Sequence, residues 1–339
     1  MILLLTEMLD RTADEVQGLL EARGVPVLRL NPASFPREAE ASMRIDDDHL
    51  MRSYLSLNGM PWALQDVRAV WLRRPDDAEV PPQVDEIASR FVQREWRHFL
   101  DDLWHTLDAR WLPGPPSLTA TGREKLPQLA AALDVGLEIP DTLITSDPAE
   151  ARAFWTAHQG RIISKVLDRK YLPPGCDPGS EDAWRCYTEV VSGRALSHLS
   201  GLRYAPAVFQ AYVPKRAELR LVLVGERAFA AEIRSQHNHH TRHDWRRYDP
   251  YHTPYVPHAL PESVLERCRA LLRRLDLSFG AFDLVLTPDG RYVFLEVNPT
   301  GEWQWVARAA GLPIAEAVAD WLSPPIPRAV SEACPTLAL

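Results

Sequence analysis

The chain of 339 residues has few cysteines, no long hydrophobic run and no excess of basic residues. Its four cysteines form no CxxC pair, so neither a zinc knuckle nor a disulfide framework is indicated, and a reducing cytoplasm is expected. The apolar run at residues 1–6 lacks a basic region and is too short for a signal peptide or membrane span. A net charge of -8 argues against nucleic-acid binding. We therefore expect a cytoplasmic globular protein without membrane or nucleic-acid contacts.

The order of the expected elements indicates an α/β protein with several lobes. Apolar runs at 2–6 and 25–30 flank an amphipathic helix that begins with the capping box Thr12-x-x-Glu15, so a parallel βαβ unit opens the chain. The clearest linker is Pro113-Gly-Pro-Pro116. We expect an N-terminal α/β subdomain, a central lobe, a C-terminal lobe and a tail, over residues 1–114, 115–209, 210–323 and 324–339.

A predicted hairpin near the carboxyl end carries the most informative side chains. Two alternating apolar runs flank Thr-Pro-Asp-Gly at 287–290, a sequence typical of a hairpin turn. If the last two of these residues form a two-residue turn, Asp283 lies opposite Glu296. Alternation along the second strand places four side chains on one face: Tyr292, Phe294, Glu296 and Asn298.

Two carboxylates and an amide oxygen are hard ligands that suit Mg²⁺ held between protein and phosphates. Asp283, Glu296 and Asn298 are therefore the expected metal ligands. The alternative is an ordinary hairpin with solvated acids. Glu and Asn inside an apolar strand favour the metal site, because unpaired charge is costly there.

Several short motifs occur together in an order that resembles ATP-grasp ligases: Lys125, Ile162-Ile-Ser-Lys165, Phe209-Gln-Ala-Tyr-Val-Pro-Lys215, Glu218-Leu-Arg220, and Asp283 with Glu296-Val-Asn298. Four further segments narrow the resemblance to microviridin-type graspetide synthetases, which mature ribosomal peptides: 70–75, 233–236, 244–246 and 294–303. The resemblance covers about residues 65 to 322.

The resemblance implies an ATP-grasp fold with ATP between the central and C-terminal lobes. It implies an ATP- and Mg²⁺-dependent ligase that phosphorylates an Asp or Glu side chain of a precursor peptide. A Ser or Thr hydroxyl, or a Lys amine, of that peptide then displaces phosphate to form an ω-ester or ω-amide ring. The implied partners are the precursor peptide and a second copy of the chain in a homodimer.

Two other functions stay open. One is a ligase that adds amino acids to a small carboxylate or to a protein terminus. The other is a nucleotide-dependent module that binds a leader peptide without catalysis. Phosphate release with free amino acids as acceptors would favour the amino-acid ligase over the cyclase. ATP turnover with a peptide would exclude the non-catalytic module.

By the same resemblance, the remaining site residues contact nucleotide or the reacting groups. Composition alone would make Lys125 a solvated helix lysine, whereas Lys165 ends an apolar strand where a lysine is unfavourable. The nucleotide set is Lys125, Lys165, Gln210, Tyr212, Val213, Glu218 and Arg220. The catalytic set is Arg220, Arg234, Asp244 and Arg246. Residues 234–247 are locally basic, which fits attraction of an acidic peptide or of phosphates. The alternative is a disordered loop.

Overall fold

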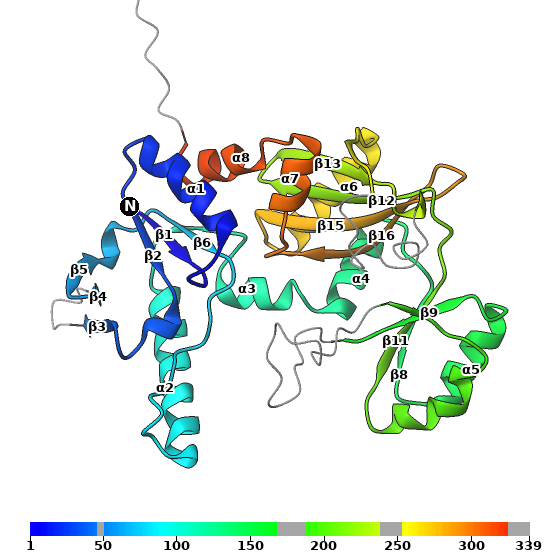
Figure 1. The fold of residues 1–339 in the computed structure, drawn as a ribbon, viewed down its shortest axis with the longest axis horizontal. Coiled ribbons are helices and arrows are strands. Elements are labelled where there is room, and N and C mark those ends of the chain that lie inside the picture. The colour runs from blue at the N-terminus through cyan, green and yellow to red at the C-terminus, as the bar shows by residue number, and fades with distance from the viewer. Residues whose placement is uncertain (46–50, 168–187, 238–252, 325–339) are drawn as a thin grey trace, which may run out of the picture. The chain divides into compact units, whose positions relative to one another are not determined.

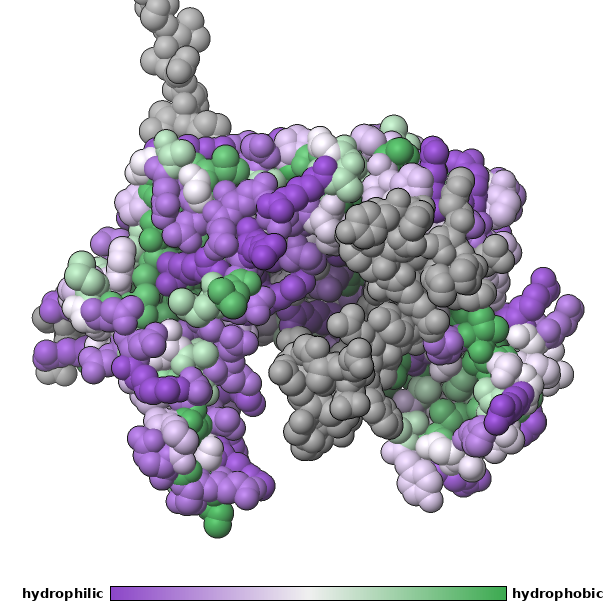
Figure 2. Space-filling model, in the orientation of Figure 1, coloured by the Kyte–Doolittle hydropathy of each residue, from purple (hydrophilic) through white to green (hydrophobic). Residues whose placement is uncertain are grey.

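The computed structural model describes residues 1–45, 51–167, 188–237 and 253–324. These residues form two compact units. The first unit consists of Met1–Leu112 together with the described residues from Ala315 on, and the second consists of Pro113–Ile314. Polar and charged side chains cover most of the surface of each unit in the view of Figure 2.

The first unit contains a parallel sheet in the order β2-β1-β6-β7, which confirms the predicted parallel βαβ start. Its strands are β1 (Ile2–Leu5), β2 (Val27–Leu30), β6 (Ala69–Leu72) and β7 (Arg110–Leu112). Its helices are α1 (Arg11–Ala22), α2 (Glu86–His105) and α8 (Ile314–Leu322), with short 3-10 turns at η1 (Pro32–Ser34) and η2 (Leu64–Asp66). An antiparallel sheet adds β3 (Ala39–Ile45), β4 (Met51–Leu57) and β5 (Met60–Ala63).

Helix α1 begins at Arg11 because Asp10 caps it. The Asp10 carboxylate accepts hydrogen bonds from the backbone N–H groups of Thr12 and Ala13, at 3.0 and 3.1 Å. The capping box predicted to start at Thr12 is therefore wrong, since Thr12 already lies inside the helix and is buried. A carboxylate is also the better acceptor at the positive end of a helix.

The same Asp10 carboxylate forms a buried ion pair with Arg73, just after β6. The distances from Arg73 Nε and Nη2 to the carboxylate oxygens are 2.7 and 3.1 Å, and the side chains are 2% and 4% exposed. Burial alone would raise the pKa of Asp10, but Arg73, the Thr6 hydroxyl and the Ala13 N–H together lower that pKa to about 2. The pair joins the loops that follow β1 and β6.

The second unit contains two sheets (Figure 1). The smaller has the order β10-β9-β11-β8, formed by β8 (Thr142–Thr145), β9 (Ile162–Lys165), β10 (Glu189–Val190) and β11 (Ala207–Ala211). Helix α5 (Pro148–Ala157) and the turn η3 (Ala195–Arg203) share a hydrophobic core with it. As predicted, α5 has Asp147 as its N-cap, with Pro148 at its first position.

The larger sheet of the second unit has the order β14-β13-β12-β15-β16. Its strands are β12 (Ala217–Val224), β13 (Arg227–Ile233), β14 (Tyr255–Pro257), β15 (Phe279–Leu286) and β16 (Tyr292–Asn298). The helices of this unit are α3 (Pro116–Thr121), α4 (Lys125–Asp134), α6 (Glu262–Arg274) and α7 (Gln304–Ala310), and η4 (Ser235–His237) follows β13. Helices α4 and α6 pack on one face, where they bury Leu129, Leu272, Phe282, Phe294 and Val297 in one core. The opposite face, which we call the polar face, carries Glu218, Arg220 and Asp283 among the buried apolar residues Val222, Ala281 and Val285.

The β15–β16 hairpin has the predicted pairing but a different turn. Asp283 lies opposite Glu296, as predicted. The turn has three residues, 288–290, because the Thr287 N–H donates to the carbonyl of Arg291. An odd loop alone would have put the two acids out of register.

A bulge at Leu295 restores the register. Leu284 pairs with Phe294, and the next pair is Asp283 with Glu296, so Leu295 is the extra residue. The prediction that Tyr292, Phe294, Glu296 and Asn298 share one face is therefore wrong. The bulge reverses the alternation, so Tyr292 and Phe294 turn to the core with Val297, whereas Glu296 and Asn298 turn to the polar face.

Candidate active site

An arginine–carboxylate pair forms the centre of the polar face of the larger sheet. Arg220 on β12 pairs in register with Asp283 on β15, and its Nη1 donates to Asp283 Oδ1 at 2.8 Å. Its Nη2 donates to the backbone carbonyl of Glu302 at 2.7 Å. Glu296 follows on the next strand, β16. A cation and two carboxylates therefore lie side by side across three strands.

Lys125 joins this group from the start of α4. Its Nζ lies 3.2 Å from Glu296 Oε2, and both side chains are 16% exposed. A lysine is unfavourable at the positive end of a helix. The contact with Glu296 offsets that cost and holds the first turn of α4 against β16.

The turn after β16 is packed tightly against Arg220. The Asn298 Oδ1 accepts a hydrogen bond from the Thr300 N–H at 3.0 Å. A Cβ at Gly301 would lie 2.6 Å from the Cβ of Ala281 and 2.8 Å from Arg220 Nη2, so only glycine fits without a shift. The position of Arg220 thus depends on this turn as well as on Asp283.

A small pocket brings four predicted residues together: Lys125, Lys165, Gln210 and Glu296. Gln210 lies on β11 and is 3% exposed, and its Nε2 donates to the Thr142 hydroxyl at 3.0 Å. Its Oε1 is buried and has no hydrogen-bond partner among the described residues. A buried acceptor of this kind is costly unless a ligand supplies the donor.

The link between β11 and β12 holds the other predicted nucleotide residues. Tyr212 and Val213 are half-buried, and the Tyr212 N–H donates to the carbonyl of Arg161 at 2.9 Å. Glu218 forms a buried ion pair with Lys215 at 2.7 Å. Since alternation along β12 puts Glu218 on the same face as Arg220, it lies on the polar face of the sheet.

The structure does not bring Arg234 into this group. It follows β13, and its Nε donates to Glu232 Oε1 at 3.1 Å; alternation along β13 puts Glu232 on the face that carries Ala228 and Ala230 to the core. Asp244 and Arg246, and most of the predicted basic stretch, lie outside the described residues. Their roles stay predictions.

The sequence reasoning missed two residues that shape the site. Gly301 sits in the crowded turn described above. Gln128 lines the pocket and bonds the backbone of β16. Gln128 follows Lys125 by three residues, so both lie on one face of a helix. This spacing could have identified Gln128 from the sequence.

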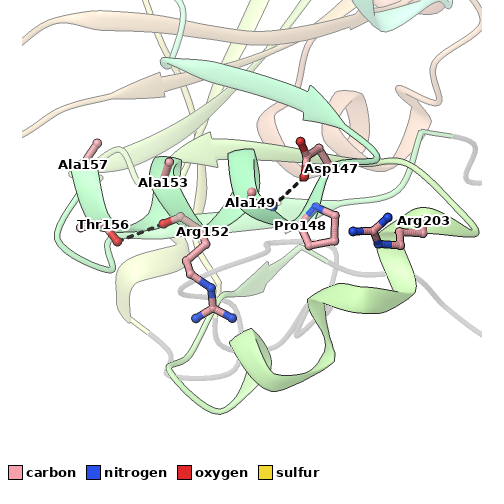
Figure 3. A pocket seen from close by; sticks show the side chains of 8 residues that line it. All are labelled: Asp147, Pro148, Ala149, Arg152, Ala153, Thr156, Ala157 and Arg203. Atoms are coloured by element: carbon pink, nitrogen blue, oxygen red, sulfur yellow. Dashed lines mark hydrogen bonds between the residues drawn. The ribbon is translucent and has the colours of Figure 1, made fainter.

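A second, wider hollow lies on α5 (Figure 3). Its lining includes Asp147, Arg152 and Arg203, and the exposed side of α5 contributes three alanines. Among the described residues that line it, none belongs to the predicted site. The Asp147 carboxylate accepts a hydrogen bond from the Ala149 N–H at 2.8 Å, so it caps the start of α5.

The comparisons agree with the sequence resemblance. The family described as the MvdD pre-ATP grasp domain matches residues 1–116. The macrocyclase MdnB from Microcystis aeruginosa MRC is 35% identical, with a TM-score of 0.78 over 96% of this chain and 99% of that chain. The chain belongs to the graspetide-type ATP-grasp macrocyclase family. The predicted ATP-grasp fold and ligase class are thereby confirmed.

Two further solved structures are similar over the same length. Macrocyclase MdnC from Microcystis aeruginosa MRC, bound with precursor peptide MdnA, is 28% identical, with a TM-score of 0.82 over 95% of this chain and 98% of that chain. A Chryseobacterium gregarium RiPP-associated ATP-grasp ligase, in complex with ADP and a leader and core peptide, is 28% identical, with a TM-score of 0.85 over 95% and 96%. No curated protein sequence matches the chain. Among the described residues, no helix is long and apolar enough to cross a membrane.

Proposed function

We propose that this graspetide-type ligase uses ATP and Mg²⁺ to activate Asp or Glu side chains of a ribosomal precursor peptide and to close ω-ester or ω-amide rings in the same peptide. The observation that carries the proposal is the register of the larger sheet. It sets Asp283 and Glu296 opposite each other, between Arg220 and the pocket with Lys125, Lys165 and Gln210. We also propose a homodimer in the cytoplasm as its working state.

The donor set on the polar face fits Mg²⁺. Asp283, Glu296 and Asn298 offer only oxygen ligands, and the two carboxylates are largely buried, so their charge requires compensation. Arg220 and Lys125 supply part of it. Among the described residues, no three or more His, Cys, Asp or Glu side chains form a cluster that could hold a metal ion. A competing metal site of that composition is therefore not found in this part of the chain. A bound Mg²⁺ would offset charge on the nucleotide phosphates.

The side chains that line the small pocket offer contacts for a nucleotide that has an exocyclic amine on its base. Gln210 Oε1 is an acceptor that such an amine would satisfy, and Lys125 and Lys165 line the same pocket as cations for phosphate oxygens. Tyr212 and Val213 supply backbone groups from the link that follows β11. Glu218, which Lys215 holds on the polar face, would accept a hydrogen bond from a ribose hydroxyl.

The chemistry proceeds in two displacements. A peptide carboxylate oxygen attacks the terminal phosphorus of ATP, the bond to ADP breaks, and an acyl phosphate forms. A peptide hydroxyl or amine then attacks the acyl carbon, loses its proton, and expels phosphate. Arg220, fixed by Asp283 and by the Glu302 carbonyl, holds a positive charge beside the place where phosphate charge develops. The acyl phosphate must also be shielded from water.

The direct test uses a candidate precursor peptide, to be sought among short reading frames near the gene as a leader followed by Ser or Thr and Asp or Glu clusters. Incubation of the full-length protein with that peptide, ATP and Mg²⁺ should remove one water per ring and release one phosphate per ring, as read by mass spectrometry. A gain in mass by amino-acid residues would instead indicate the carboxylate–amine ligase. Peptide binding without phosphate release would indicate a non-catalytic module. Unchanged mass with saturating ATP and a verified leader would contradict the cyclase.

Gln210→Leu should raise the KM for ATP about tenfold, because the buried acceptor that would meet the base amine is removed. The variant should also lose preference for ATP over a purine nucleotide that lacks the amine. Thr142→Val is the matched control: it removes the partner of Gln210 Nε2 and that hydroxyl's own bond to the Pro140 carbonyl, but it leaves Gln210 Oε1 in place. Steady-state phosphate release at varied nucleotide measures both effects. An unchanged KM and preference in Gln210→Leu would remove this residue from the nucleotide site.

A further inference from the structure

The outer edge of β16 is paired by a glutamine side chain. β16 is an edge strand of its sheet, so its outward backbone groups need partners from elsewhere. At Val297 both are supplied by Gln128 on α4: its Nε2 donates to the Val297 carbonyl at 2.7 Å, and the Val297 N–H donates to its Oε1 at 3.0 Å. The amide of Gln128 thus binds Val297 as a neighbouring strand would.

Gln128 is 3% exposed and makes a third bond, from Nε2 to the carbonyl of Gly122 at the end of α3. Gly122 itself is crowded, since a Cβ there would lie 2.8 Å from a Leu277 methyl group and 3.2 Å from Pro299. One side chain therefore ties the start of α4, the end of α3 and strand β16 together. All its hydrogen-bonding groups are used within the protein.

The bonded residue is the one between two proposed metal ligands. Val297 separates Glu296 from Asn298, and it follows the bulge at Leu295, where the ladder to β15 is interrupted. Lys125, one helical turn before Gln128, contacts Glu296 itself. Helix α4 thus fixes both the backbone and one carboxylate of this strand where the bulge leaves it least constrained.

We propose that Gln128 is a positioning residue for the metal ligands, which acts by holding Val297 so that Glu296 and Asn298 turn to the polar face at a fixed spacing. The inference rests on the proposed metal site. Gln128 need not touch nucleotide, metal or peptide for this role. A defect at Gln128 should therefore appear first in metal affinity and in local backbone protection.

The test compares two variants of the full-length protein. Gln128→Met keeps the volume and removes all three bonds, whereas Gln128→Glu keeps an acceptor for the Val297 N–H but, when ionised, cannot donate to the two carbonyls. Gln93→Met, an exposed glutamine on α2, is the control. Hydrogen exchange of the ligand-free protein should rise at least tenfold at the Val297 N–H in Gln128→Met and less in Gln128→Glu.

Binding of Mn²⁺ in the presence of ADP, followed by electron paramagnetic resonance, should weaken about tenfold in both variants, with the KM for peptide unchanged. Wild-type exchange and wild-type Mn²⁺ affinity in a folded Gln128 variant would overturn the proposal. If Gln128→Met does not fold, Gln128→Glu decides by the same two measurements. Absence of Mn²⁺ binding in the wild type would instead contradict the metal site, and hydrogen exchange would still report whether Gln128 holds Val297.

Discussion

The double variant Asp283→Asn, Glu296→Gln is expected to consume ATP at least about a thousandfold more slowly than the wild type with its peptide. Both substitutions keep shape and remove charge, so the loss reports the electrostatics of the polar face. The proposed Mg²⁺ would lose both carboxylates and keep only neutral amide oxygens. Arg220 and Lys125 would also lose their anionic partners. They would then compete with Mg²⁺ for phosphate oxygens that are less favourably placed.

The same sheet offers a matched control for this loss. Glu232 on β13 is a partly buried carboxylate that pairs with Arg234, on the opposite face from Asp283. Glu232→Gln should keep ATP consumption within a few-fold of the wild type. Phosphate release at saturating peptide, with titrated Mg²⁺, measures all variants. A double variant that consumes ATP normally, or a Glu232→Gln variant equally inactive, would contradict the proposed metal site.

Local patterns were sufficient to predict much of the hairpin that carries these acids. Alternating apolar residues and a Thr-Pro-Asp-Gly turn define two antiparallel strands, and Asp283 opposite Glu296 follows from them. The three-residue turn and the bulge at Leu295 were not predicted. Their effects on register cancel, so the pairing of the acids was correct although the face of Phe294 was wrong. A bulge is set by packing on α4 and α6, which the strand sequence does not contain.

Contacts between distant segments were the least accessible to sequence reasoning. Gln128 and Val297 are 169 residues apart, and Asp10 and Arg73 are 63 apart. Gln128 lies within α4 and Asp10 just before α1, but no periodicity shows which backbone group or charge a polar side chain will meet. The resemblance to a family supplied the order of the site motifs, whereas the register of the larger sheet supplies their geometry.

Arg73→Met is expected to destabilise the first unit by about 3–5 kcal/mol, because it leaves the Asp10 carboxylate buried without its cation. The Asp10 carboxylate would keep only the Thr6 hydroxyl and the N–H groups at the start of α1. Asp10→Asn keeps a good helix cap, so the double variant Asp10→Asn, Arg73→Met should recover most of the loss. Urea unfolding followed by near-ultraviolet circular dichroism measures the three variants.

The pH dependence of unfolding gives an independent check on this ion pair. Because the folded protein lowers the pKa of Asp10 to about 2, below its ordinary value of 3.8, the pair stabilises the fold fully above about pH 4. That contribution should be lost as pH falls from 4 towards 2. The double variant lacks the carboxylate, so the difference in unfolding free energy between it and the wild type should shrink over this range. A difference that stays constant from pH 5 to pH 2.5, or an Arg73→Met variant as stable as the wild type, would mean that the pair contributes nothing to holding the loops after β1 and β6 together.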